Sequence, residues 1–267
     1  KKAFEAMQAG NKPFIRVYKA VWGFLEASQP EGLARYTKVV NAAMAKMPKQ
    51  RQRQQAETVA EVYQEAARAQ LSYKEVVQKL FANLQKRPEG ASAEVNICPT
   101  LKGLPRLIEK LILSGTIATD VLRGMVKCTT LAGVAATLEE LQALEDLGLI
   151  KITWIKDRIV ESPSDGQWRD VLVNFVVLAK AGGVPHHVCE LQIAHATMLT
   201  ARKGMPGHVV YNRIRNALEL LQQKHGKGVA VDMVALAAFL TELGGGKSLG
   251  VEGYQSSVPA TCEEIAG

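Results

Sequence analysis

The stretch Cys189-Glu190-Leu191-Gln192-Ile193 alternates between polar and apolar side chains, and it decides how the chain is expected to fold. Successive side chains of a β-strand point to opposite faces of the sheet. A strand here turns Glu190 and Gln192 to one face and sends Leu191 and Ile193 into an apolar layer on the other. Because burying an unpaired carboxylate costs several kcal/mol, Glu190 should meet a cation, a network of donors or a metal.

Four segments upstream also have the character of strands. Helical spacing separates some of them, at Leu101–Leu113 and Leu131–Leu147, and the second helix ends before Gly148, which suits the left-handed position after a helix. The strands from Ile150 onward follow one another, which favours antiparallel pairing. We therefore predict an α+β fold with a mixed, mostly antiparallel five-stranded sheet flanked by helices. The expected strands are Glu94–Cys98, Leu122–Cys128, Ile150–Ile155, Val171–Leu178 and His187–Ile193.

The third strand carries its apolar residues at every second position. Ile150, Ile152 and Trp154 follow this period, so all three are expected on one face of the sheet. The fourth strand is rich in β-branched residues, which suit a pleated and half-buried surface.

The N-terminal region, residues 2–87, has apolar positions at intervals of three and four, so helices are expected throughout. Candidate stops lie at 10–13, 28–30 and 47–48. The run Lys49–Gln55 is rich in Lys, Arg and Gln and is expected to open one of these helices as a solvated face. Contact with phosphate or RNA is the alternative.

The stretch Lys86–Ser92 is polar and contains both Pro and Gly, which makes it the best domain boundary. We expect an all-helical N-terminal region at 1–87, a sheet domain at 93–225, and a C-terminal helix with a flexible tail at 226–267.

Composition favours an intracellular protein with anionic partners. The chain has 267 residues, 33 Lys and Arg against 26 Asp and Glu, and a formal charge of +7. Such a surplus attracts nucleotides, RNA or acidic protein surfaces. No apolar run approaches the roughly 20 residues that span a bilayer, so no membrane span is expected. Because the first residue is Lys1, any targeting segment is not visible, and an organelle matrix is compatible with the charge.

The cysteines have neither zinc-ligand spacing nor a Cys-x-x-Cys pair, which favours a reducing compartment. They are widely scattered, at Cys98, Cys128, Cys189 and Cys262.

Two acidic residues are candidates for a metal site. Asp120 stands just before the second strand, and Glu190 lies within the fifth. Two carboxylates brought together from neighbouring strands could hold Mg²⁺, which takes one or two carboxylates together with nucleotide phosphates. An ion pair of Glu190 with Arg123 or Arg169 is the alternative.

Basic and aromatic residues near these acids could bind a nucleotide. Lys102, Arg106 and Lys110 recur every four residues on one predicted helix and could clamp a triphosphate, although a solvated face has the same pattern. Trp168 lies in a turn at 165–170 that leads into a strand, and it could stack on a base, whereas a lone Trp is more often a core or rim residue.

The order of these features resembles the RelA/SpoT-type synthetase domain, which has a nucleotidyltransferase fold. The resemblance runs from about Val95 to Leu221. The shared features are, in order along the chain, a basic helix, an Asp-x-x-Arg-Gly strand, a Gly-x-aromatic turn, a Glu-x-Gln strand and a helix ending in His-x-x-Tyr. The matching stretches are Asp120–Gly124, Gly166–Asp170, Glu190–Ile193 and His208–Tyr211.

The resemblance implies an enzyme that transfers pyrophosphate from ATP to the ribose 3′-hydroxyl of GDP or GTP. By the same resemblance, Asp120 and Glu190 hold magnesium, and Glu190 also draws the proton from the attacking hydroxyl. Trp168 stands for the tyrosine that stacks on guanine. The implied nucleotide-binding residues are Lys102, Arg106, Lys110, Arg123, Trp168, Gln192, His208 and Tyr211.

The sequence departs from the family pattern on the acceptor side. Leu172 stands in place of a histidine and Asp170 in place of a serine, and Ala194-His195 replaces Arg-Thr. Since polar recognition rests on such groups, guanine specificity is weakened. Two hypotheses follow: an ATP- and magnesium-dependent transferase, or a non-catalytic member that serves as a protein-binding subunit of a larger complex, such as one in an organelle. RNA binding is a third, with charge alone behind it.

Overall fold

The computed structural model describes residues 2–98, 100–114, 116–161, 163–164, 167–184 and 186–203. The chain divides into two compact units, one formed by Tyr18–Ala201 and the other by Lys1–Val17 with Arg202–Gly267. Two predicted site residues, His208 and Tyr211, lie outside the described residues, as do the expected C-terminal helix and tail.

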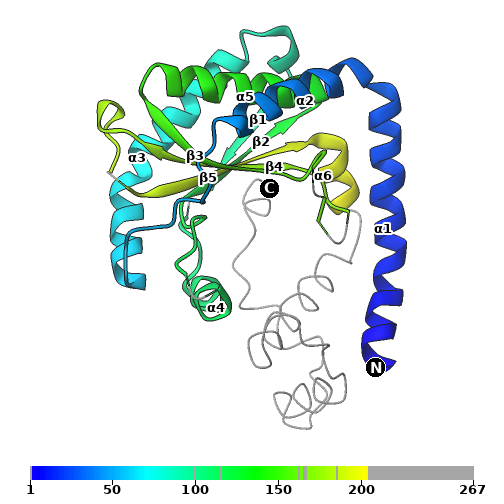
Figure 1. The fold of residues 1–267 in the computed structure, drawn as a ribbon, viewed down its shortest axis with the longest axis horizontal. Helices are drawn as coiled ribbons and strands as arrows, with labels where there is room; N and C mark the ends of the chain where they lie inside the picture. Colours follow the sequence, from blue (N-terminus) through cyan, green and yellow to red (C-terminus); the bar gives the residue numbers. More distant parts are fainter. Residues whose placement is uncertain are drawn as a thin grey trace. The chain divides into compact units, whose positions relative to one another are not determined.

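The sheet has five strands in the order β1-β2-β5-β4-β3. Three neighbouring pairs are antiparallel, and β2 with β5 is parallel. The prediction of a mixed, mostly antiparallel five-stranded sheet flanked by helices is therefore confirmed (Figure 1). The strands are β1 (Glu94–Ile97), β2 (Arg123–Cys128), β3 (Ile150–Asp157), β4 (Val171–Val177) and β5 (Val188–His195).

The helices agree with the sequence pattern except near the N-terminus. The candidate stop at 10–13 is wrong, because α1 runs through it; propensity is a weak prior that a long helical context overrides. No helix in the described part of the chain is long and apolar enough to cross a membrane. The helices are α1 (Lys2–Ser28), α2 (Pro30–Ala45), α3 (Val59–Leu84), α4 (Leu104–Ser114), α5 (Leu131–Asp146) and α6 (Ala196–Lys203), with short 3₁₀ turns η1 (Pro88–Gly90) and η2 (Ala179–Ala181).

The run Lys49–Gln55 does not open a helix, which corrects the expectation from its composition. It lies in the irregular segment between α2 and α3. The start of α3 is fixed by a capping box, in which the Thr58 hydroxyl accepts from the Glu61 backbone N–H and the Glu61 carboxylate accepts from the Thr58 N–H. This reciprocal pair satisfies the first free donors of the helix and places its start at Val59.

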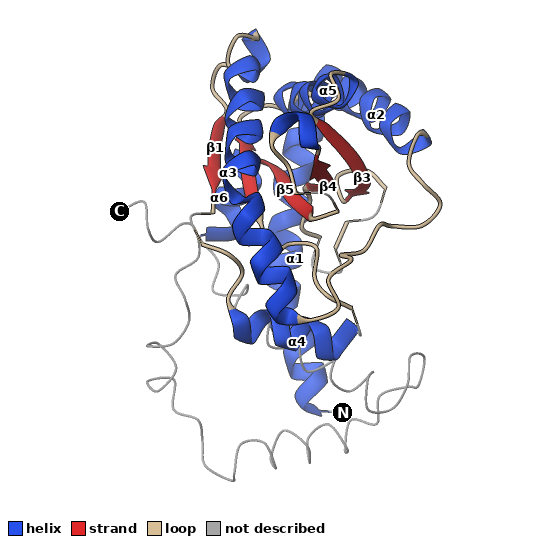
Figure 2. Ribbon diagram, turned by 90° about the vertical axis from the view of Figure 1, so that its left-hand side faces the viewer, coloured by secondary structure: helices blue, strands red, loops and turns tan. Residues whose placement is uncertain are grey.

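One face of the sheet is apolar and carries the core. Side chains such as Val126, Leu191, Val173 and Phe175 are buried there. Helices α2, α3 and α5 form the layer over this face, and Figure 2 shows α2 and α5 side by side above the strands. The alternation predicted for the fifth strand is confirmed, because Leu191 and Ile193 are buried while Glu190 and Gln192 lie on the opposite face and are part-exposed.

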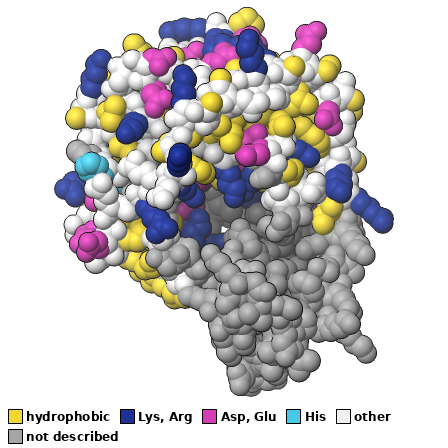
Figure 3. Space-filling view, in the orientation of Figure 1, with side chains coloured by type: hydrophobic (Ala, Val, Ile, Leu, Met, Phe, Trp, Pro, Cys, Tyr) yellow, Lys and Arg dark blue, Asp and Glu magenta, His cyan; other side chains and the backbone are white. Residues whose placement is uncertain are grey.

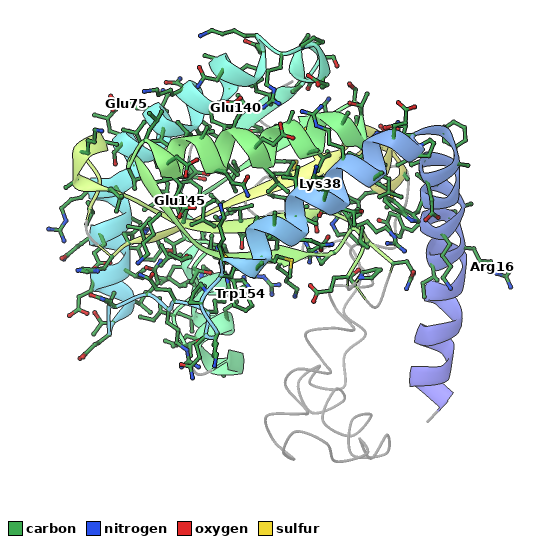
Figure 4. All side chains as sticks on the ribbon, turned by 45° about the horizontal axis from the view of Figure 1, so that its top comes forward. Arg16, Lys38, Glu75, Glu140, Glu145 and Trp154 are labelled. Carbon is green, nitrogen blue, oxygen red and sulfur yellow. The ribbon has the colours of Figure 1, made fainter. Side chains whose placement is uncertain are left out.

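A β-bulge in β3 overturns the expectation for Trp154. Ile152 pairs with Phe175, and the next registered pair is Trp154 with Asn174, so Thr153 is the extra residue. The extra residue shifts the alternation by one position, as bulges do. Trp154 therefore leaves the apolar face that holds Ile150 and Ile152 and lies on the polar side of the sheet. Figure 4 shows it on the side away from Glu140 of α5.

The glycine of the Asp-x-x-Arg-Gly stretch makes room for α3. The Tyr73 hydroxyl donates to the backbone carbonyl of Glu190 at 2.9 Å, and its ring stacks on Phe175. A Cβ at Gly124 would lie 2.8 Å from the Tyr73 oxygen, closer than atoms of this kind approach. Gly124 thus allows one hydrogen bond to tie α3 to β5 beside Glu190.

We predict that Gly124→Ala lowers the free energy of unfolding by about 1–3 kcal/mol, because the methyl group displaces Tyr73. The loss should shrink in a Tyr73→Phe background, which removes the clashing oxygen. Urea denaturation of the two single variants and the double variant measures this coupling. Gly23→Ala is the control, since no atom lies within 4 Å of its added Cβ. Equal losses in both backgrounds would contradict this account of Gly124.

Candidate functional site

The candidate site lies on the polar face of the sheet, where β2 and β5 begin. Their parallel register places Arg123 beside Glu190, and the antiparallel register of β4 places Asn174 on the other side of Glu190. Asp120 lies three residues before β2 and is brought to the same end of the sheet. In the space-filling view of Figure 3, Lys and Arg side chains gather toward the middle of the view, below the helical layer.

Asp120 is the centre of a buried cluster of charges. Lys102 Nζ and Lys110 Nζ each lie 2.6 Å from the same carboxylate oxygen, Oδ2. The other oxygen, Oδ1, is buried and has no hydrogen-bond partner. Burial alone would raise the pKa of Asp120, but the charges of Lys110 and Lys102 outweigh it and hold this pKa well below its usual range. Asp120 is therefore ionised and keeps one oxygen open.

Lys102 is held in an environment that weakens its own charge. Its pKa falls to about 8, first because of burial and also because of the neighbouring charges of Lys110 and Arg123, while Asp120 opposes the fall. At pH 7 the ammonium group is still the major form. Lys102 precedes α4 rather than lying on it, so the expected helical stripe is reduced to Arg106 and Lys110.

Glu190 is a carboxylate without a partner among the side chains that the structure describes. Neither arginine of the alternative hypothesis pairs with it: Arg123 donates to the Asp120 carbonyl, and Arg169 donates to the Ile159 carbonyl and lies over the Trp22 ring. Burial raises the pKa of Glu190, the negative charge of Asp120 raises it further, and nearby cations oppose the rise. Asp120 and Glu190 are thus close enough for their charges to interact.

These two carboxylates suit magnesium only together with a phosphate ligand. The described residues contain no group of three or more His, Cys, Asp or Glu that could enclose a metal. Magnesium in nucleotide sites takes one or two carboxylates and completes its shell with phosphate oxygens and water. The buried, open Oδ1 of Asp120 and the part-exposed carboxylate of Glu190 provide such a donor pair.

The loop between α2 and α3 adds two residues that sequence reasoning missed. Arg51 Nη2 donates to Thr119 Oγ1 at 2.5 Å and to Asn174 Oδ1 at 2.7 Å, which brings its guanidinium beside Glu190. Gln54 fixes the loop, because its side-chain amide exchanges two hydrogen bonds with the backbone of Val188 at 2.8 and 2.9 Å. The signal was present in the run Lys49–Gln55, but its inward direction depends on contacts distant in the sequence.

Among the residues where the sequence departs from the family pattern, Asp170 is bound by several polar side chains. Its fully buried carboxylate accepts two hydrogen bonds from Arg158, at 2.5 and 2.6 Å. It also accepts from Trp168 Nε1 at 2.8 Å and from Gln192. The Trp168 ring further packs edge-on against Tyr18, with ring centres 5.7 Å apart. Trp168 and Gln192 are therefore engaged within the protein, unlike Glu190.

The sequence matches no protein-family model and no curated protein. Among solved structures, the fold is similar to a GTP pyrophosphokinase family protein from Streptococcus pneumoniae. That similarity has 15% identity, covers 70% of this chain and 98% of that chain, and gives a TM-score of 0.42. A chain in the complex between the type VI effector Tas1 and its immunity protein is also similar, with 14% identity, 67% and 91% coverage, and a TM-score of 0.37. Identities and TM-scores of this size assign no activity to the chain.

We predict that Glu190→Gln stabilises the protein at pH 7 by roughly 1 kcal/mol, the usual gain from relieving a strained functional position. The folded state raises the pKa of Glu190, so it holds this proton more tightly than the unfolded chain does. Stability is then lost as pH rises above the ordinary carboxyl value of about 4.3, and the gain from Gln should vanish near pH 4.

Thermal or urea unfolding of the wild type and the variant, at pH 4 and pH 7, measures this difference. Glu94→Gln on β1 is the control, because its carboxylate is largely exposed and the change there should be small. A variant less stable than the wild type at pH 7 would show that the carboxylate is favourably paired in the folded protein.

Proposed function

We propose that this chain binds ATP with magnesium on the polar face of its sheet and transfers pyrophosphate to the ribose hydroxyl of a second nucleotide. The observation that carries the proposal is the pair of acids at the start of β2 and β5. Glu190 has no partner among the described side chains, and Asp120 has one open oxygen within a cluster of lysines. A purely structural ion-pair network has no need for an unpartnered carboxylate at its centre.

The lysines would supply the binding of the phosphates. Lys102 and Lys110 both donate to Asp120 Oδ2. Their ammonium groups can also donate hydrogen bonds to phosphate oxygens. A triphosphate entering here would take over these donors and leave both oxygens of Asp120 free. Magnesium held by Asp120 and Glu190 would neutralise charge on the phosphates. Arg123 on β2 lies close enough to Lys102 to lower the pKa of that lysine, and Arg106 lies on α4.

Glu190 is suited to accept the proton in the transfer step. The hydroxyl oxygen of the acceptor forms a bond to the β-phosphorus of ATP, and the bond from that phosphorus to the α–β bridging oxygen breaks. AMP leaves with the bridging oxygen, and the hydroxyl proton goes to Glu190. A carboxylate whose pKa is raised by burial and by Asp120 is a better base near neutral pH than an ordinary one.

A second candidate is a member of the same fold that has lost catalysis and serves in a larger complex. The contacts of Asp170 favour it, because Trp168 and Gln192 are both bound to this carboxylate and Arg158 neutralises it. The residues implied for guanine recognition are thus used internally. In that case the lysines around Asp120 form an ion-pair cluster, and the basic surface serves a protein or RNA partner.

We expect isothermal titration to detect ATP binding that depends on magnesium and that weakens about tenfold or more in Glu190→Gln, since one tenfold step is about 1.4 kcal/mol. Lys127→Ala is the matched control. Lys127 lies on the same strand as Arg123 but pairs with Glu94 on β1, so its loss should leave ATP binding unchanged.

No heat of binding at millimolar ATP, in the presence of magnesium, would exclude the transferase and favour the subunit of a complex. Equal weakening by both substitutions would point to a general effect of charge rather than to a magnesium site.

A further inference from the structure

Trp154 lies on the face of the sheet opposite to the one that its alternation with Ile150 and Ile152 predicted. The bulge at Thr153 turns Trp154 toward the polar face, where its ring is part-exposed, and Trp154 makes no hydrogen bond with the described residues. β3 is an edge strand of the sheet. Thr153 itself is buried with its hydroxyl unsatisfied, so the bulge carries a cost in the fold. Bulges at sheet edges commonly re-aim a side chain beside a functional site.

A row of paired residues connects Trp154 with the acids. Trp154 pairs with Asn174 on β4, Asn174 pairs with Glu190 on β5, and Glu190 pairs with Arg123 on β2. Neighbouring strands lie about 4.8 Å apart, so two steps along the row place Trp154 roughly 10 Å from Glu190. Asn174 is buried beneath Arg51 and also donates to the Cys189 carbonyl. A base that stacks on Trp154 would therefore extend its ribose over Arg51 and Asn174 and bring a ribose hydroxyl toward Glu190.

Cations stand along the same row. Arg51 is bonded to Asn174, in the middle of the row. Lys156 is two residues beyond Trp154, on the same face and exposed. Burial lowers the pKa of Lys156, and the charges of Arg158 and Arg51 lower it further, so Arg51 and Lys156 are close enough to repel each other. A phosphate group between them would relieve this repulsion.

We propose that Trp154 is the base-stacking residue of an acceptor subsite for a nucleoside diphosphate or triphosphate, with Arg51 and Lys156 facing its phosphates and Asn174 beneath its ribose. The subsite rests on the proposed transferase function and specifies where the second substrate lies. It differs from the place implied by resemblance, where the stacking residue is Trp168. That indole is already bound to Asp170 and packed against Tyr18.

The test uses the full chain and unlabelled GDP, titrated by isothermal calorimetry with magnesium and a non-hydrolysable ATP analogue present. Base stacking on one aromatic residue is worth roughly 1–3 kcal/mol. Trp154→Leu should therefore weaken GDP binding about tenfold or more, and Trp154→Phe should recover most of it. The matched variant Trp168→Leu should leave GDP binding within about twofold. Circular dichroism checks that each variant is folded.

The other outcomes separate this proposal from the function on which it rests. GDP binding that is lost in Trp168→Leu but kept in Trp154→Leu would overturn the subsite. So would an absence of GDP binding in a wild-type chain that binds ATP, which leaves the ATP site standing. ATP titrated alone tests that site, and it should bind Trp154→Leu as tightly as the wild type. If oligouridine binding depends on Trp154 and GDP does not bind, the surface serves single-stranded RNA, and the proposal is wrong.

Discussion

The parallel pairing of β2 with β5 is the constraint on which the rest of the site depends. It sets Glu190 beside Arg123, and Asp120, three residues before β2, lies at the same end of the sheet. Both carboxylates then share one partly dehydrated region, where each raises the cost of the other's charge. The lysines offset the cost of the charge on Asp120 by pairing with it. Glu190 has no such partner among the described side chains. Such an imbalance is typical of sites that bind or react.

The helical layer holds this pairing from the opposite face. Tyr73 of α3 reaches the backbone of β5 at Glu190 through the space that Gly124 leaves open. Its ring also stacks on Phe175 of β4, so one side chain joins α3 to three neighbouring strands of the sheet. The Asp-x-x-Arg-Gly stretch, which leads into β2, thus has two roles. The acid and the arginine face the site, and the glycine admits the support behind it.

The two halves of the polar face differ in how far their groups are already satisfied. Around Asp120 and Glu190, an oxygen and a carboxylate have no partner among the described residues. Around Asp170, four donor contacts occupy one carboxylate, and the aromatic residue of the turn is fixed. A fully bonded buried network is rigid and offers little to a ligand. In the proposed function the open half takes the donor nucleotide, and in the proposed acceptor subsite Trp154 supplies the aromatic surface.

The sequence by itself determined the fold class, the five strands and the two faces of β5, because these follow from short-range periodicity and turn residues. It also indicated Asp120 and Glu190 as candidates, since a carboxylate at the start of or inside an apolar strand is conspicuous. Only the tertiary structure decided that Arg51 enters the site and that Trp154 leaves the core. Gln54 docks the Arg51 loop on the backbone of Val188, and the bulge in β3 depends on its pairing with β4. Both depend on partners far along the chain, so the local sequence pattern does not predict them.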